Sequence, residues 1–111
     1  MKLLHTASNP CGTSLQGYQS IDYSELVRIF GKPTYAHCTD IELDKVNFEW
    51  DLQFKDEDGK EITATIYDWK TLPHHSTAPG YRWHVGGFTY EAVAAVSEYI
   101  REWREKNATE N

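Results

Sequence analysis

Apolar and polar residues alternate strictly between positions 46 and 55 of this chain. The apolar set consists of Val46, Phe48, Trp50, Leu52 and Phe54. Successive side chains of a β-strand point to opposite faces of the sheet, so five consecutive repeats predict a strand with one face in the core and the other in water. The next four residues read Asp-Glu-Asp-Gly, and Gly59 suits the positive φ of a tight turn. This pattern predicts the first arm of a β-hairpin.

Three further strands are predicted with shorter patterns. The second arm of the hairpin, 61–69, places Ile62, Ala64 and Ile66 inward and leaves Tyr67 and Trp69 on the opposite face. A strand over 81–85 alternates Tyr81, Trp83 and Val85 with Arg82 and His84. A short strand over 15–20 is predicted with Leu15 and Tyr18 directed inward. Between the hairpin and 81–85 lies an aperiodic segment, 70–80, with two prolines and the length of a lid.

Two helices are marked by end signals. Asp22 followed by Glu25 forms a capping-box pattern for a first helix, which Gly31 ends in the left-handed region before Pro33. Thr89 is expected to cap a second helix that runs to about Lys106. Its apolar stripe consists of Val93, Val96, Ile100 and Trp103.

The order β-α-β-β-β-α predicts an α+β fold. We expect an antiparallel sheet of three to four strands with both helices packed on one face, which leaves the other face open. The 111 residues allow a single domain, 1–111, with a polar N-terminal loop over 1–14 and a flexible tail over 107–111.

The formal charge of −6 argues against a nucleic-acid duplex as partner, because neutralising phosphates needs clustered Lys and Arg. The charge is uneven. Residues 40–61 hold nine acidic residues against three lysines, and we expect those carboxylates to be solvated and to titrate normally. Residues 62–90 hold Asp68 against Lys70 and Arg82, so this part of the chain is the one suited to an anion.

The cysteine content and the lengths of the apolar stretches bear on the cellular compartment of the protein. The two cysteines, Cys11 and Cys38, make neither a metal-binding spacing nor a disulfide framework. The N-terminus lacks the apolar stretch of a signal peptide. No apolar stretch in the chain is long enough to cross a membrane. We therefore expect a cytoplasmic protein without metal, cofactor or membrane partner.

Four features could bind a ligand. Gly86-Gly87 before the second helix would let an anion approach backbone amides. Tyr67 and Trp69 beside Lys70 put aromatic rings on the open face, where a ligand, a second subunit or the chain's own N-terminal segment could cover them. Arg82 and His84 lie on the same face and suit a phosphate. The small polar side chains of 8–14 could wrap a ligand or form a loose terminus.

Catalysis is not predicted. His84 and Asp68 could form a dyad, but no recognisable turn places a serine or cysteine nucleophile beside them. His74-His75 lacks a third metal ligand at helical or hairpin spacing. The expected catalytic and metal residues are therefore none.

Three stretches together resemble small phage-encoded proteins. In those proteins a helix ending in Phe-Gly-x-Pro precedes a hairpin ending in Ile-Tyr-Asp-aromatic-Lys and a Trp-His-hydrophobic-Gly-Gly strand, as in 26–33, 66–70 and 83–87 here. The resemblance covers most of 23–100 and leaves out 1–20. Such proteins look similar to viral sponges that bind cyclic nucleotides or related immune signals without cleaving them, as in evasion of CBASS or Thoeris defence.

The resemblance implies a non-catalytic protein of the host cytoplasm that sequesters a cyclic nucleotide or another phosphate-bearing small molecule. Lys70 and Arg82 would pair with phosphates, and rings would stack on bases. The implied ligand-binding residues are Asn9, Thr13, Ser14, Tyr18, Tyr67, Trp69, Lys70, Tyr81, Arg82, His84, Gly86 and Gly87. Two alternatives stay open: an acidic inhibitor whose 40–61 segment mimics nucleic acid, and a structural module that dimerises through the open face. A homo-oligomer is compatible with each.

Overall fold

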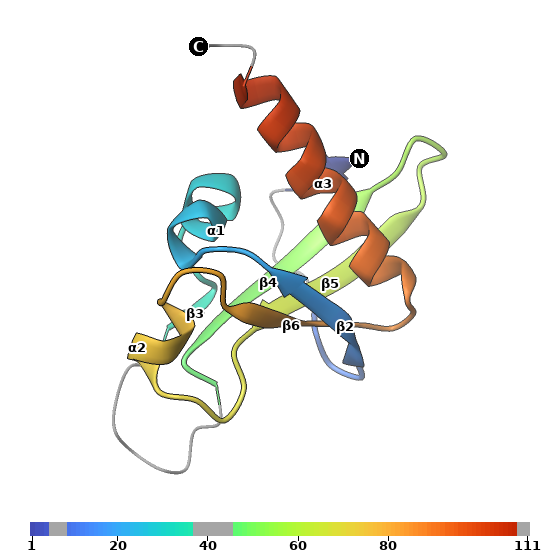
Figure 1. Cartoon of the computed structure of the whole chain (residues 1–111). Helices are drawn as coiled ribbons and strands as arrows, with labels where there is room; N and C mark the ends of the chain where they lie inside the picture. Colours follow the sequence, from blue (N-terminus) through green and yellow to red (C-terminus); the bar gives the residue numbers. More distant parts are fainter. Residues whose placement is uncertain (5–8, 37–45, 109–111) are drawn as a thin grey trace.

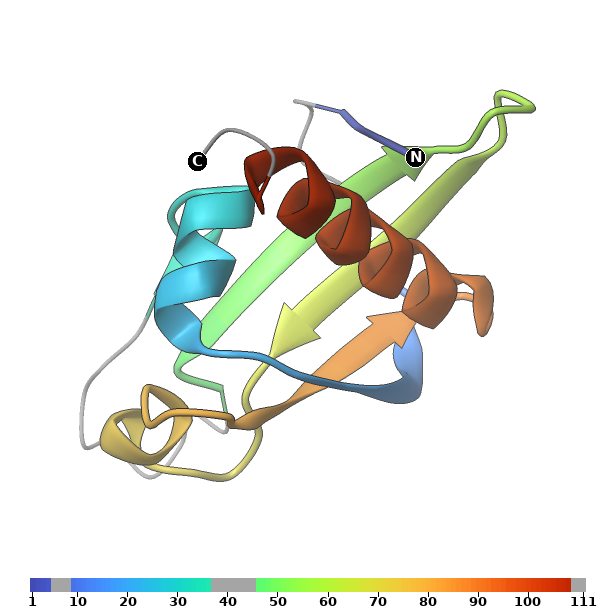
Figure 2. The ribbon, with the colours of Figure 1, turned by 45° about the horizontal axis from the view of Figure 1, so that its top comes forward.

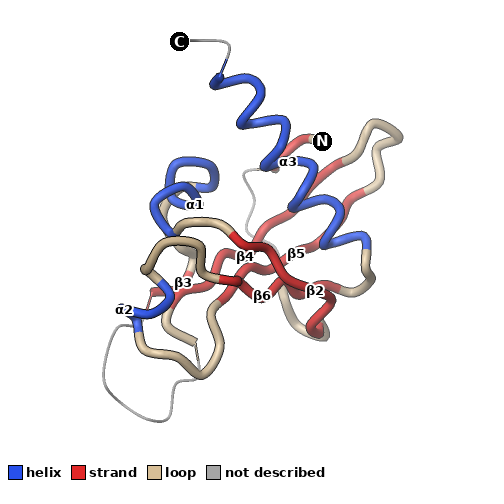
Figure 3. Tube along the Cα trace, viewed as in Figure 1, coloured by secondary structure: helices blue, strands red, loops and turns tan. Residues whose placement is uncertain are grey.

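The structure of the chain is a computed structural model that describes residues 1–4, 9–36 and 46–108. Figure 1 shows the elements and Figure 3 their types. In chain order they are β1 (Lys2–Leu3), β2 (Ser14–Ser20), α1 (Tyr23–Phe30), β3 (Tyr35–Ala36), β4 (Phe48–Lys55), β5 (Glu61–Tyr67), α2 (Pro73–Ser76), β6 (Arg82–Gly87) and α3 (Glu91–Ala108).

The strands form one antiparallel sheet in the order β1-β4-β5-β6-β2, with β3 also paired to β4. The predicted hairpin is confirmed, with Trp50 opposite Ile66 and Phe54 opposite Ile62. The strands β1 and β3 were not predicted. Each has two residues and pairs with the edge of β4 that β5 leaves free. Because β1 lies within 1–14, this segment is not a loop throughout its length.

Both long helices cover the same face of the sheet, as predicted, and Figure 2 shows α1 and α3 side by side above it. The inward residues of β4 and β5 are buried as the alternation requires. Trp50 and Trp83 meet edge to face in the centre, with ring centroids 5.5 Å apart. The fold is therefore α+β with one face of the sheet in the core and one left open by the helices.

The predicted capping box of α1 is wrong. The Asp22 carboxylate makes no bond to its own helix and instead accepts a 2.6 Å hydrogen bond from the amide of Gly80. Glu25 forms a bidentate ion pair with Arg104 of α3, at 2.7 and 2.9 Å. Both side chains therefore bond to residues distant in the sequence, and not to the local amides that a capping box would use. The predicted end of α1 is confirmed, because Gly31 has φ +84° and donates its amide to the carbonyl of Val27.

Strand β2 contains an irregularity that reverses a predicted direction. Its register against β6 shifts between Leu15 and Gly17, so that Leu15 pairs with Gly86 and Tyr18 with His84. Residues three apart would normally face opposite sides, but the extra residue puts both on the open face. Leu15 and Tyr18 therefore point outward, and their exposed fractions are 46% and 40%.

The structure also differs from the predicted flexible tail and from the predicted aperiodic segment 70–80. Helix α3 continues through Ala108, so 107 and 108 are helical, whereas 109–111 lie outside the described residues. The segment 70–80 contains the one-turn helix α2.

Candidate functional site

A row of side chains runs across the open face of the sheet. In register, Glu49 of β4 lies opposite Tyr67 of β5, Tyr67 opposite His84 of β6, and His84 opposite Tyr18 of β2. All four come from strands whose opposite faces form the core. The period of two that buries Trp50, Ile66 and Val85 therefore sets this row on the other side.

The aromatic members of the row are in contact with one another. The His84 ring stacks on Tyr67 at 5.3 Å and meets Tyr18 edge to face at 5.1 Å. The guanidinium carbon of Arg82 lies 3.9 Å from the centroid of Tyr18, and Trp69 lies 6.3 Å from Tyr67. The structure thus brings together five of the predicted residues on one face, with a cation at the β2 end.

A pocket of about 320 Å³ lies over the middle of this face. Its volume is at the lower end of the range of small-molecule sites. It is bordered by residues from the segment before β2, from β2 itself, from the segment before β4, and from β4, β5, the segment after β5, and β6. These residues are Pro10, Thr13, Ser14, Val46, Glu49, Thr65, Tyr67, Trp69 and Gly86.

Residues of the N-terminal segment border the aromatic rings of the open face. Pro10, Thr13 and Ser14 line the same pocket as Tyr67 and Trp69. The described part of this segment is held in a turn, because both the amide and the hydroxyl of Thr13 donate to the carbonyl of Pro10. The chain's own N-terminal residues therefore form one wall, while Ser8 lies outside the described residues.

Gly86 supplies the space in the floor of the pocket. A Cβ built on Gly86 would lie 2.5 Å from the hydroxyl oxygen of Thr65 and 3.4 Å from the Tyr67 ring. Any side chain here would push into the volume that those two residues border. The glycine is thus required by close approach and not by a turn.

Two carboxyl groups lie side by side next to the pocket. Glu49 lines it, and Asp51 is two residues further along the same face of β4. Burial, together with a hydrogen bond to the Asp51 carboxylate, raises the pKa of Glu49 to about 8. The Oδ1 atom of Asp51 is buried and has no hydrogen-bond partner among the described residues. At neutral pH Glu49 is therefore mostly protonated.

This pair corrects the expectation that the carboxylates of 40–61 are all solvated. Glu49 and Asp51 are half-buried in the sheet. The turn residues Glu57 and Asp58 are exposed, as expected, and Asp40, Glu42 and Asp44 lie outside the described residues.

The raised pKa of Glu49 predicts a pH dependence of stability. A carboxyl group whose pKa is higher in the folded than in the unfolded protein favours folding while it is protonated. This contribution is lost as the pH rises from about 4.5 to about 8. The melting temperature of the wild type, measured relative to Glu49→Gln, should therefore fall across this window. Parallel melting profiles for the two proteins would contradict the raised pKa of Glu49.

His84 is the second titratable group of the row. Burial and the positive charge of Arg82 lower its pKa, so its ring is neutral at pH 7. Its Nδ1 atom is buried and has no hydrogen-bond partner in the described part of the chain.

Seven of the twelve predicted ligand residues do not line the pocket. Tyr18, Arg82 and His84 belong to the row on the open face, and the other four lie elsewhere. A Cβ on Gly87 would lie 2.4 Å from that of Ala92, so Gly87 faces α3 and permits its close packing. Tyr81 packs on Trp83 beside the core. The side-chain oxygen of Asn9 closes a turn by accepting a hydrogen bond from the amide of Cys11. Lys70 is exposed, and its ammonium lies 5.9 Å from the centroid of the Trp69 ring.

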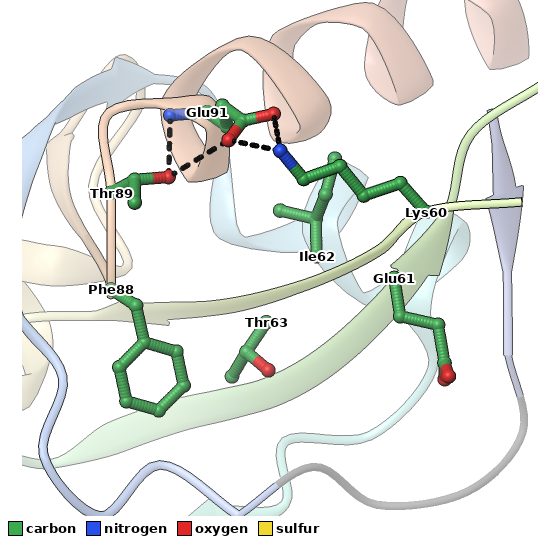
Figure 4. A pocket seen from close by; sticks show the side chains of 7 residues that line it. All are labelled: Lys60, Glu61, Ile62, Thr63, Phe88, Thr89 and Glu91. Carbon is green, nitrogen blue, oxygen red and sulfur yellow. Dashed lines mark hydrogen bonds and ion pairs between the residues drawn. The ribbon is translucent and has the colours of Figure 1, made fainter. Parts of the chain in front are cut away.

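The anion site expected at the start of α3 is not formed. Gly86 and Gly87 lie in register with β5 on one side and β2 on the other, so the sheet uses their backbone groups. Figure 4 shows that the first turn of α3 already carries a carboxylate. Glu91 binds Lys60 at 2.7 Å and accepts a hydrogen bond from the Thr89 hydroxyl. The pocket drawn there, of about 190 Å³, is thus bordered by polar groups that bind one another.

Comparisons with protein-family models, curated proteins and solved structures found no match for this chain. Over the described ranges, no cluster of three or more His, Cys, Asp or Glu residues has the arrangement of a metal site. None of the described helices is long and apolar enough to span a membrane.

Proposed function

We propose that this protein binds a nucleotide-type small molecule in the open-face pocket and sequesters it without cleaving it. The observation that carries this proposal is the pocket itself, where aromatic rings, hydroxyl groups and a protonated carboxyl group surround a volume of about 320 Å³. The phage sponge that the motifs resemble would use such a site to remove a second messenger from host antiviral defence.

The shape and lining of the pocket favour a flat heterocycle. Tyr67 and Trp69 offer ring surface, and base stacking on an aromatic side chain contributes about 1–3 kcal/mol per base. Hydroxyl groups of Thr13, Ser14 and Thr65 stand around the same space and suit the polar edge of a base or a ribose. These contacts require neither a nucleophile nor a general acid.

The charges along the row favour one orientation of the ligand. The Asp51 carboxylate, whose negative charge helps to raise the pKa of Glu49, lies at the β4 end and repels phosphate. Arg82 lies over Tyr18 at the β2 end, beyond His84. We therefore place the base over Glu49 and Tyr67 and the phosphate toward His84 and Arg82.

Replacing Trp69 tests the proposal with little disturbance of the fold. Trp69 lines the pocket and is 41% exposed. Trp69→Ala should raise the dissociation constant of a bound nucleotide by about tenfold or more, because one stacking partner is lost. Isothermal titration calorimetry against GMP, AMP, ADP-ribose and cyclic di-GMP measures the effect.

Tyr90→Ala is the matched control. Tyr90 is an exposed aromatic residue, 68% accessible, that does not line the pocket. It should leave the dissociation constant unchanged. If no nucleotide of the panel binds the wild type, or if both variants weaken binding equally, the proposed function is wrong.

A further inference from the structure

Strand β2 ends the sheet on one side, and we infer that this free edge pairs with the same strand of a second copy of the chain. The sheet order places β2 beyond β6, and the described part of the chain places no further strand against it (Figure 1). The two copies would form one continuous antiparallel sheet about a two-fold axis through Tyr18. This interface is independent of the proposed function.

The register of β2 against β6 shows which backbone groups face outward. The amide of Ile21 donates to the carbonyl of Tyr81 at 3.2 Å, and this bond fixes the alternation along the ladder. In an antiparallel ladder, residues that bond to one neighbouring strand alternate with residues that face the other side. Gly17 therefore bonds to β6, whereas Tyr18 and Ser20 direct their amide and carbonyl groups to the open edge.

Tyr18 occupies the position that a two-fold axis requires. A symmetric dimer uses the same patch on both copies, so a residue on the axis must pair with itself. Two Tyr18 residues in such a pair exchange both of their backbone hydrogen bonds, and Gly17 of one copy then lies opposite Gln19 of the other. The register shift of β2 ends at Gly17, so the stretch 17–20 that would pair is regular.

The absence of charge on β2 favours a second copy as the partner. The chain has a net charge of −6, so two copies repel each other unless their contact is free of acidic residues. Among the described strands of more than two residues, β2 alone has no charged side chain. Proteins commonly protect a free edge with a charge or a proline, and β2 has neither. The guanidinium of Arg82, on the neighbouring strand, lies against the Tyr18 ring of its own chain.

Exposed apolar side chains gather around the same edge. Phe88 lies beside the segment that precedes β2, because a Cβ built on Gly12 would be 3.4 Å from its ring. Val93 of α3 lies over β2, 2.8 Å from a Cβ built on Gly17, and Tyr90 is one helical turn before Val93. A second copy at this edge would cover apolar surface as well as backbone groups. The exposed large apolar residues on or beside β2 are Leu15, Tyr18, Phe88 and Tyr90.

Pairing at this edge would keep both ligand pockets on one face of the joined sheet. The axis that relates two antiparallel strands is perpendicular to the sheet, so the open faces of the two copies lie on the same side. Tyr18 is not among the residues that line the pocket. The dimer would therefore extend the aromatic row of each copy without closing either pocket.

Size-exclusion chromatography with multi-angle light scattering tests the dimer on the full chain. A reducing buffer prevents the exposed Cys11 from cross-linking two copies. At the upper end of a dilution series the wild type should have twice the 12.8 kDa mass of one chain. Tyr18→Lys puts two like charges on the axis and should raise the dimer dissociation constant by about tenfold or more.

Tyr35→Lys is the matched control. Tyr35 is the same residue type, is 39% exposed where Tyr18 is 40% exposed, and lies on β3 at the opposite edge of the sheet. This variant should keep the dissociation constant of the wild type.

Cross-linking tests the register in a background of Cys11→Ser and Cys38→Ser, which removes both natural thiols. Tyr18→Cys should form a covalent dimer on mild oxidation, because the Cα atoms of a bonded antiparallel pair lie about 5.5 Å apart, within reach of a disulfide. Ser20→Cys is the control on the same strand. Its two copies would lie on the order of 14 Å apart along the strands, so it should stay monomeric on a non-reducing gel.

A wild type that keeps the 12.8 kDa mass at every concentration would overturn the inference. A dimer that Tyr35→Lys weakens and Tyr18→Lys does not would place the contact at the other edge, which also overturns it. Should Tyr18→Lys fail to fold by circular dichroism, the cross-link decides. A covalent dimer of Tyr18→Cys then supports the pairing, and its absence, or an equal yield from Ser20→Cys, contradicts it.

Discussion

Trp50→Ala should lower the free energy of unfolding by about 3–5 kcal/mol, the usual cost of truncating a large aromatic side chain in a core. Trp50 is 1% exposed, and its ring contacts Trp83 and Tyr23. Its indole N–H also donates a 2.9 Å hydrogen bond to the carbonyl of Gly31 at the end of α1. The substitution therefore leaves a cavity and removes a bond between the helix and the sheet. Urea denaturation followed by circular dichroism measures it.

Trp69→Ala is the matched control for stability, because it truncates the same residue type on the opposite face. With Trp69 41% exposed, its loss should change the free energy of unfolding by no more than about 1 kcal/mol. A Trp50→Ala variant as stable as Trp69→Ala would mean that the two faces of the sheet are assigned the wrong way round.

Asp68→Ala should lower the free energy of unfolding by about 2–4 kcal/mol. The Asp68 side chain is fully buried, and its oxygens accept hydrogen bonds from the amides of Asn47 and Phe48 and from the Asn47 side chain, at 2.8 to 3.0 Å. Alanine would leave those buried donors without an acceptor, and each such donor costs about 1–3 kcal/mol. Thermal and urea unfolding measure the loss.

The same substitution should weaken ligand binding. Asp68 lies between Tyr67 and Trp69, and its partner Asn47 lies between Val46 and Phe48, so this bond joins two sides of the pocket rim. Asp58→Ala, at the exposed hairpin turn, is the control and should affect neither property. If Asp68→Ala unfolds like Asp58→Ala, the buried network does not hold the start of β4.

The strongly periodic parts of the fold could be predicted from the sequence. Alternation in 46–55 and the Asp-Glu-Asp-Gly turn determine the β4–β5 hairpin. A shift of the register by one residue would move the apolar side chains from the core face to the open face. The same argument placed Tyr67, Arg82 and His84 on the open face. Local signals thus described the central strands and both long helices.

Features that depend on distant partners could not be predicted. The strands β1 and β3 have two residues each, too few for a periodic signal, and exist through their pairing with β4. The bulge in β2 turns Leu15 and Tyr18 outward without a local sequence signal. Asp22 and Glu25 have the residue types of a capping box, but Gly80 and Arg104 offer them partners that only the folded chain brings near.

The site was predicted in part. Thr13, Ser14, Tyr67, Trp69 and Gly86 were expected at a ligand site and line one pocket. Glu49 and Thr65 were missed, although the alternation already set both on the open face. The register of the hairpin puts Glu49 opposite Tyr67, and counting back from the turn at 56–59 would have revealed this pair. The raised pKa of Glu49 depends on burial and on Asp51, which composition does not reveal.

The central claim is that the open-face pocket is the ligand site, and an amide ¹⁵N–¹H correlation spectrum titrated with the tightest-binding nucleotide tests it most directly. The account predicts that the largest shifts occur at Thr13, Thr65, Tyr67 and Gly86, with the indole signal of Trp69 moving while that of Trp50 stays in place. Shifts concentrated at Lys60, Phe88 and Glu91, or a spectrum that does not change with any nucleotide, would contradict it.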